Sequence, residues 1–236
     1  TWSMVWENET WRWCGSNTGQ LPLTASAALV EAYPTATATA APTLLAEAST
    51  ASVDADESPY LTLTMASPTH MAVFSPDGKL IVTANADGIA HIWNAATGER
   101  YLQLIGHTAE VSSATYSPDG KQIVTASFDG TARIWDVATG EELRQLIGHT
   151  DAVDSAAYSP DGKQIVTTSW DQTARIWDAA TGAEVRQLIG HTYAVGSAAY
   201  SPDGKQIVTA SGDGTARIWD ADTGEELRQF IVRTSL

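Results

Sequence analysis

The chain repeats itself with a period of 42 residues between residues 59 and 236. The tetrapeptide SPDG occurs at 75–78, 117–120, 159–162 and 201–204, and GHT occurs at 106–108, 148–150 and 190–192. HIWN at 91–94 is followed by RIWD at 133–136, 175–178 and 217–220. Segments 117–158 and 159–200 are identical at 34 of 42 positions. A fixed period of this length indicates a modular array, and copies this similar are structural units rather than specialised parts.

Each copy is predicted to form four short antiparallel strands. In the third copy the strand candidates are AVDSAAYS (152–159), QIVTTSW (164–170), TARIWDA (173–179) and AEVRQLI (183–189). The proline and glycine of SPDG suit a tight hairpin turn. Ile165, Val166 and Ile176 leave both faces of such a sheet partly apolar, so neighbouring sheets must cover both. Twisted sheets stacked face to face wrap into a β-propeller.

The pattern GHT…SPDG…S-x-D…RIWD resembles the WD-repeat family of β-propellers, and the resemblance covers residues 59–236. It implies an all-β fold of four four-stranded blades, forming a partial ring or a fragment of a larger array. The blades are expected near 69–105, 110–147, 152–189 and 194–232.

The resemblance also implies a buried hydrogen-bonded tetrad in three of the copies. Its members would be His107, Ser127, Asp129 and Trp135; His149, Ser169, Asp171 and Trp177; and His191, Ser211, Asp213 and Trp219. In each, the indole N–H would donate to the serine, the serine would bond the histidine, and the aspartate would hold the other ring nitrogen. A fully satisfied polar chain of this kind makes a blade rigid. The first copy departs from the pattern, with Met65 and Asn85 at the histidine and serine positions.

Catalytic and metal-binding interpretations have weaker support. His149, Ser169 and Asp171 could form a catalytic triad, but the trio recurs three times, whereas a working nucleophile is normally single. The acidic pairs at 141–142 and 225–226 are expected to form a solvated edge with charge pairs to nearby arginines. His91, which replaces the arginine of the later copies, is predicted to be a surface variant. The sequence therefore predicts no enzyme activity, no cofactor and no metal site.

The charge and cysteine content narrow the choice of partners. The formal net charge of −15 argues against nucleic acid and against an anionic membrane surface. Cys14 is the single cysteine, which excludes an intrachain disulfide and a multi-cysteine metal site. These features leave the compartment open.

The first 58 residues differ from the repeats. Residues 1–14 alternate tryptophans with polar residues, which predicts a β-hairpin with one aromatic face, the tail of a truncated upstream domain. Residues 15–58 are rich in Ala, Thr, Ser and Pro, which predicts a flexible, disordered linker. Linkers of this composition are common in exported bacterial proteins and tilt the localisation outward.

The positions that differ among the nearly identical copies predict a binding surface. The sets are Ala109/Asp151/Tyr193, Ser112/Asp154/Gly196, Phe128/Trp170/Gly212 and Gly130/Gln172/Gly214. All fall at the rim opposite the SPDG turns, where the resemblance places the partner contacts of the family. We expect a protein or peptide ligand to contact Phe128, Trp170, Tyr193, Asp151, Asp154, Glu110 and Gln172. Neutral drift in loops is the alternative explanation.

These features favour a non-catalytic interaction scaffold. The alternatives are a sensor or regulatory module of a larger bacterial protein, and an enzyme whose site lies in the central funnel with Ser112 and Asp154. Four blades are few for a closed ring. The sequence thus predicts a fragment of a longer array, and self-association through blades one and four is a further possibility.

Overall fold

The computed structural model describes residues 3–7, 10–14 and 67–231, which belong to two compact units. In the first unit β1 (Ser3–Glu7) pairs antiparallel with β2 (Thr10–Cys14). Ser3 lies opposite Cys14, and Glu7 lies opposite Thr10. The predicted linker at 15–58 and the Met65 position lie outside the described residues. That the hairpin is the tail of another domain stays a prediction.

The second unit consists of four antiparallel sheets of four strands each. Blade 1 contains β3 (Thr69–Phe74), β4 (Leu80–Asn85), β5 (Ile89–Asn94) and β6 (Arg100–Ile105). Blade 2 contains β7 (Val111–Tyr116), β8 (Gln122–Ser127), β9 (Thr131–Asp136) and β10 (Glu142–Ile147). Blade 3 contains β11 (Val153–Tyr158), β12 (Gln164–Ser169), β13 (Thr173–Asp178) and β14 (Glu184–Ile189). Blade 4 contains β15 (Val195–Tyr200), β16 (Gln206–Ser211), β17 (Thr215–Asp220) and β18 (Glu226–Ile231).

The all-β, four-bladed prediction is confirmed. Within each blade the strands follow chain order, so each is a meander. No helix among the described residues is long and apolar enough to cross a membrane.

The SPDG turns are held by their own side chains. Between β7 and β8, Ser117 Oγ donates to Asp119 Oδ1 at 2.7 Å and accepts from the Gln122 amide at 2.9 Å. Gly120 has a φ of +72°, a left-handed conformation that glycine adopts without steric cost. The same contacts recur at the other three SPDG turns. This turn chemistry fixes the register of the two strands on either side.

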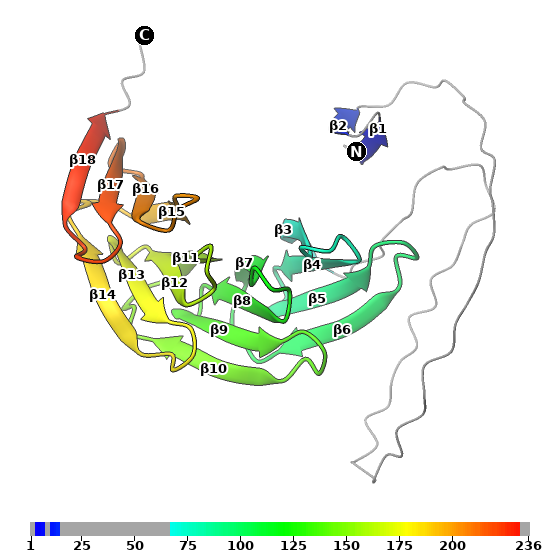
Figure 1. Cartoon of the computed structure of the whole chain (residues 1–236). Coiled ribbons are helices and arrows are strands. Elements are labelled where there is room, and N and C mark those ends of the chain that lie inside the picture. The colour runs from blue at the N-terminus through cyan, green and yellow to red at the C-terminus, as the bar shows by residue number, and fades with distance from the viewer. Residues whose placement is uncertain (1–2, 8–9, 15–66, 232–236) are drawn as a thin grey trace. The chain divides into compact units, whose positions relative to one another are not determined.

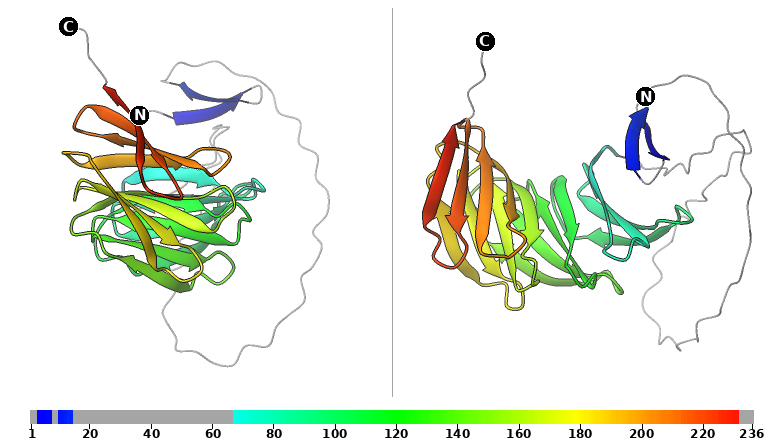
Figure 2. Two further views of the ribbon diagram at one scale, coloured as in Figure 1. Left: turned by 60° about the vertical axis from the view of Figure 1, so that its left-hand side comes forward. Right: turned by 45° about the horizontal axis from the view of Figure 1, so that its top comes forward.

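The core lies between successive blades. Val82, Ile92 and Leu104 of blade 1 pack against Ile123 and Trp135 of blade 2. All five side chains are buried. Equivalent clusters join blade 2 to blade 3 and blade 3 to blade 4. Figures 1 and 2 show the four sheets following one another around an arc, with β3, β7, β11 and β15 on its inner side.

Candidate functional site: a rim pocket between blades 3 and 4

In blade 2 a chain of hydrogen bonds links four side chains. Trp135 Nε1 donates to Thr125 Oγ1 at 2.8 Å, and Thr125 Oγ1 lies 2.7 Å from His107 Nε2. On the other side of the ring, His107 Nδ1 lies 2.8 Å from Asp129 Oδ2. The same chain recurs in blades 3 and 4, in which Thr167 and Thr209 take the place of Thr125.

This arrangement corrects the predicted tetrads at one position. The hydroxyl between tryptophan and histidine comes from a threonine, and not from Ser127, Ser169 or Ser211. The register gives the reason, because Trp135 pairs with Ile123, and Thr125 is the next residue of β8 on that face. The serine lies two residues further along the strand, a step of about 7 Å. There Ser127 donates to the Ala109 carbonyl and accepts from the Asp129 amide, and so holds the turn.

Burial and hydrogen bonding act in opposite directions on the titratable groups of this chain. Burial lowers the pKa of His107 below its ordinary value, although the hydrogen bond with Asp129 acts in the opposite direction. Burial alone would raise the pKa of Asp129, but hydrogen bonds from Thr131 and His107 outweigh it and lower the pKa to about 2. A neutral imidazole beside a carboxylate carries its proton on Nδ1, so Nε2 accepts from Thr125. Thr125 is fully buried and its hydroxyl also accepts from Trp135 Nε1, so this chain of hydrogen bonds is enclosed within the blade.

An ion pair completes the frame. Arg133 Nη1 lies 2.6 Å from Glu142 Oε2 in the neighbouring strand. Glu142 was expected to pair with the nearby Arg144, but Arg144 donates to the Leu143 carbonyl instead. Gly106 of the GHT motif packs against this pair. A Cβ there would lie 2.7 Å from Arg133 Nη1, so the close approach requires glycine.

Blade 1 keeps one of the three hydrogen bonds of this chain, because Trp93 Nε1 donates to Thr83 Oγ1 at 3.0 Å. The prediction that His91 is a surface variant is wrong. The residue is 7% exposed, and its ring centroid lies 5.6 Å from that of Trp93. Arg100 pairs with Trp93 where the other blades carry a glutamate, so an arginine at position 91 would lack its partner. Burial is the main cause of the lowered pKa of His91, with Arg100 acting in the same direction.

The predicted rim residues lie at the ends of the blades remote from the SPDG turns. Trp170 follows β12 and Tyr193 precedes β15, and their exposed fractions are 50% and 63%. The Phe128 ring centroid lies 5.6 Å from that of Trp170, so aromatic side chains of blades 2 and 3 meet. Side chains this large and this exposed have surface available for a partner.

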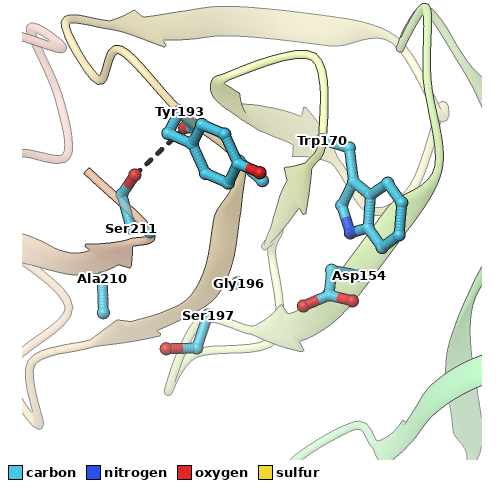
Figure 3. Close-up of a pocket in the computed structure, with 9 residues that line it drawn as sticks. Asp154, Trp170, Tyr193, Gly196, Ser197, Ala210 and Ser211 are labelled. Atoms are coloured by element: carbon cyan, nitrogen blue, oxygen red, sulfur yellow. Dashed lines mark hydrogen bonds between the residues drawn. The ribbon is translucent and has the colours of Figure 1, made fainter. Parts of the chain in front are cut away.

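A pocket of about 360 Å³ brings three of the predicted residues together. Asp154 and Trp170 contribute from blade 3, and Tyr193 contributes from blade 4. Figure 3 shows the indole nitrogen of Trp170 on the side of Asp154, with the Tyr193 ring across from it. The remaining lining residues are Ala194, Gly196, Ser197, Ala210, Ser211 and Gly212.

Two glycines of blade 4 make room for this pocket. A Cβ on Gly212 would lie 2.6 Å from Tyr193 Cδ1, so the tyrosine ring lies against the position that Trp170 occupies in blade 3. A Cβ on Gly196 would lie 3.4 Å from Asp154 Oδ2, so the absence of a side chain there opens space beside the carboxylate. The small members of the variable sets, which the sequence interpretation passed over, therefore shape the site.

Asp154 is a half-buried carboxylate. Burial raises its pKa above the ordinary value, and a hydrogen bond from the Trp170 side chain opposes the rise. Among the described residues, no lysine or arginine contributes to the shift. The carboxylate therefore sits in an apolar wall with an indole as its polar neighbour.

The other predicted rim residues do not line the pocket. Glu110 Oε2 lies 3.0 Å from His70 Nε2, between blades 1 and 2. Asp151 is exposed and accepts from the Ala152 amide, while Phe128 touches the site through the Trp170 ring. Gln172 is the one non-glycine residue with positive φ in the described part of the chain, at +72°.

A second hollow of about 360 Å³ lies at the opposite rim. It is lined by the aromatic ends of the inner strands and by the prolines of the SPDG turns, among them Tyr116, Tyr158 and Tyr200. Because the two hollows are equal in volume, size does not distinguish them. The residues that line the second hollow are nearly the same in every copy, so we interpret this hollow as part of the repeated blade structure.

No group of three or more His, Cys, Asp or Glu side chains within the described ranges could hold a metal ion. Ser112, the hydroxyl considered for a funnel enzyme, donates to the Val153 carbonyl at 2.8 Å.

Comparisons with known proteins agree with the four-bladed fold. The family model described as "WD domain, G-beta repeat" matches residues 61–94, 98–136, 140–178 and 182–220. An uncharacterized WD repeat-containing protein of Nostoc sp. is 50% identical over 40 residues, which is 17% of this chain. The chain covers 3% of the length of that bacterial relative.

Proposed function

Because this chain belongs to the WD-repeat family, we propose that it is a non-catalytic interaction scaffold that binds a protein or peptide at the rim pocket. The observation that carries the proposal is that residues from three of the sets that vary among the copies line one pocket. Asp154, Trp170 and Tyr193 differ from their counterparts in the other copies, and all three line the same pocket.

The energetics of the exposed aromatic side chains support this assignment. Tryptophan and tyrosine are enriched among the residues that dominate binding energy, and truncating one in a partner-filled pocket costs about 2 kcal/mol or more. Trp170 is braced from behind by Phe128, so little side-chain freedom is lost when a ligand covers it. The pocket therefore offers a preorganised surface.

Selection from a displayed library of random short peptides on the immobilised 236-residue chain tests the proposal. Peptides enriched on the wild type should lose at least about tenfold in affinity for Trp170→Ala/Tyr193→Ala, which corresponds to about 1.4 kcal/mol. Tyr101→Ala is the matched control, because Tyr101 is equally exposed but lies on the outer strand β6. Equal binding to the wild type and the double variant would remove the pocket from the proposal.

A regulatory module of a larger protein is the second candidate. The observation that favours it is the length of the Nostoc relative, of which the matched 40 residues make up 3%. In that case the blades would still bind through their rim, and the bound ligand would control an activity elsewhere. Full-length sequence context distinguishes this candidate from a scaffold.

A further inference from the structure

We infer that the rim pocket accepts a cationic side chain, a lysine or an arginine, from a basic peptide segment. This inference rests on the proposed function and names the chemical class of its ligand. Three independent features of the described blades support it: the negative charge of the rim, the apolar surroundings of the Asp154 carboxylate, and the aromatic side chains that line the pocket.

The two rims of the blades differ in charge. All lysines of the described blades, Lys79, Lys121, Lys163 and Lys205, belong to the SPDG turns. The loops at the pocket rim, residues 86–88, 106–110, 128–130, 148–152, 170–172, 190–194 and 212–214, contain six acidic residues and no lysine or arginine. Three of the six, Asp129, Asp171 and Asp213, are buried beside the histidines, and the surface charge comes from Asp87, Glu110 and Asp151. A surface carrying one sign of charge raises the local concentration of ligands of the opposite sign. The pocket therefore opens at the rim that attracts a cation.

Asp154 is the one charged residue in the lining of the pocket. The arginines of β13 and β17, in the same two blades, are already paired, because Arg175 Nη1 lies 2.5 Å from Glu184 Oε2 and Arg217 Nη1 lies 2.5 Å from Glu226 Oε2. A carboxylate with an apolar neighbourhood gains most from a partner of opposite charge. The open space beside Gly196 leaves Asp154 Oδ2 accessible to such a partner.

The walls suit the stem and the head of a cationic side chain. A lysine or arginine is attracted to the face of a tryptophan or tyrosine ring, and arginine also stacks on it. Trp170 and Tyr193 stand on either side of the hollow, with Asp154 below the indole (Figure 3). An alkyl stem can pack against the rings while the charged head reaches the carboxylate. An acidic or phosphorylated ligand would meet like charge at this rim.

Two displayed libraries of random short peptides test the inference, one containing lysine and arginine and one from which both are omitted. We expect enrichment on the 236-residue chain from the first library alone, with binding that depends on Trp170 and Tyr193. Replacing the basic residue of a selected peptide by norleucine should weaken binding by about tenfold. Asp154→Asn should have an effect of similar size, whereas the matched control Asp151→Asn should change binding by less than about twofold.

The outcomes are distinct. Binders from the library without basic residues that still require Trp170 and Tyr193 would overturn the cationic ligand and leave the proposed function standing. Unchanged affinity for Asp154→Asn would also overturn it. Failure of both libraries to yield any binder that depends on the two aromatic residues would overturn both proposals. Separate lysine and arginine substitutions in a selected peptide decide which cation fits better.

Discussion

At the scale of single residues, Tyr116 shows how one change disturbs a repeated frame. In the later blades, Tyr158 Oη donates to Gln122 Oε1 at 3.3 Å, and Tyr200 Oη donates to Gln164 Oε1 at 3.4 Å. The glutamine position in blade 1 is Leu80, and the Tyr116 hydroxyl is buried without a hydrogen-bond partner. A buried polar group left in this state destabilises the fold.

We expect Leu80→Gln to raise the free energy of unfolding by about 1 kcal/mol, because it supplies the missing acceptor. Urea denaturation of the wild type and the variant measures the change. The control is the same substitution in a Tyr116→Phe background, where no hydroxyl is present and no gain is expected. A gain of the same size in both backgrounds would show that the effect does not pass through the Tyr116 hydroxyl.

At the scale of the structural element, the buried histidine–aspartate pairs make the blades sensitive to acid. The pKa values of His107 and His149 are lowered from 6.5, so the unfolded chain binds more protons than the folded one just below that pH. The pKa values of Asp129 and Asp171 are lowered from 3.8 to about 2, and the stability that they contribute is lost as the pH falls through this range.

We therefore expect the midpoint of thermal unfolding to fall in two stages. The first fall should begin near pH 6.5 as the histidines of the unfolded chain become protonated, and the second should begin below about pH 4 with the aspartates. Circular dichroism at constant ionic strength from about pH 8 to about pH 3 measures both stages. An unchanged midpoint between neutral pH and pH 5 would contradict the assignment of neutral, buried histidines.

The elements show where prediction from the sequence ends. Strands and turns could be predicted because each position is repeated in every copy, and glycine and proline mark the same turns. The threonine of the tetrad was missed because Thr125 and Ser127 recur with equal regularity on one face, and only the register shows which of them Trp135 reaches. The pocket could not be predicted, because the sequence does not give the spacing between blades. That spacing places Asp154 beside Gly196 of the next copy.

At the scale of the whole repeat unit, the last blade carries an uncovered apolar face. Val208 and Phe230 are each 44% exposed, whereas their counterparts Val124 and Leu146 are fully buried against the following blade. Blades 1, 2 and 3 each bury this face against the isoleucine and tryptophan of the following blade. In a second copy the isoleucine and tryptophan of blades 2 to 4 are already covered by the preceding blade, so the complementary surface is that of blade 1, which includes the half-buried Ile81.

We predict that the 236-residue chain self-associates at micromolar concentration through this face. Sedimentation velocity over a range of concentrations should show a larger species, and Val208→Asp/Phe230→Asp should abolish it. The matched control is Leu227→Asp, which places a charge at an exposed apolar position of the same strand β18. A monomer at all concentrations, or equal association by both variants, would count against the prediction.

The near identity of the faces between blades has a consequence for how the chain reaches its native state. A surface that fits the next blade also fits the corresponding surface of any later blade, so skipping a repeat costs little contact energy. Adjacent blades meet first because the loop to be closed is short, and this kinetic advantage of neighbours sets the native order. At high concentration during refolding, the same interchangeability favours the exchange of blades between chains.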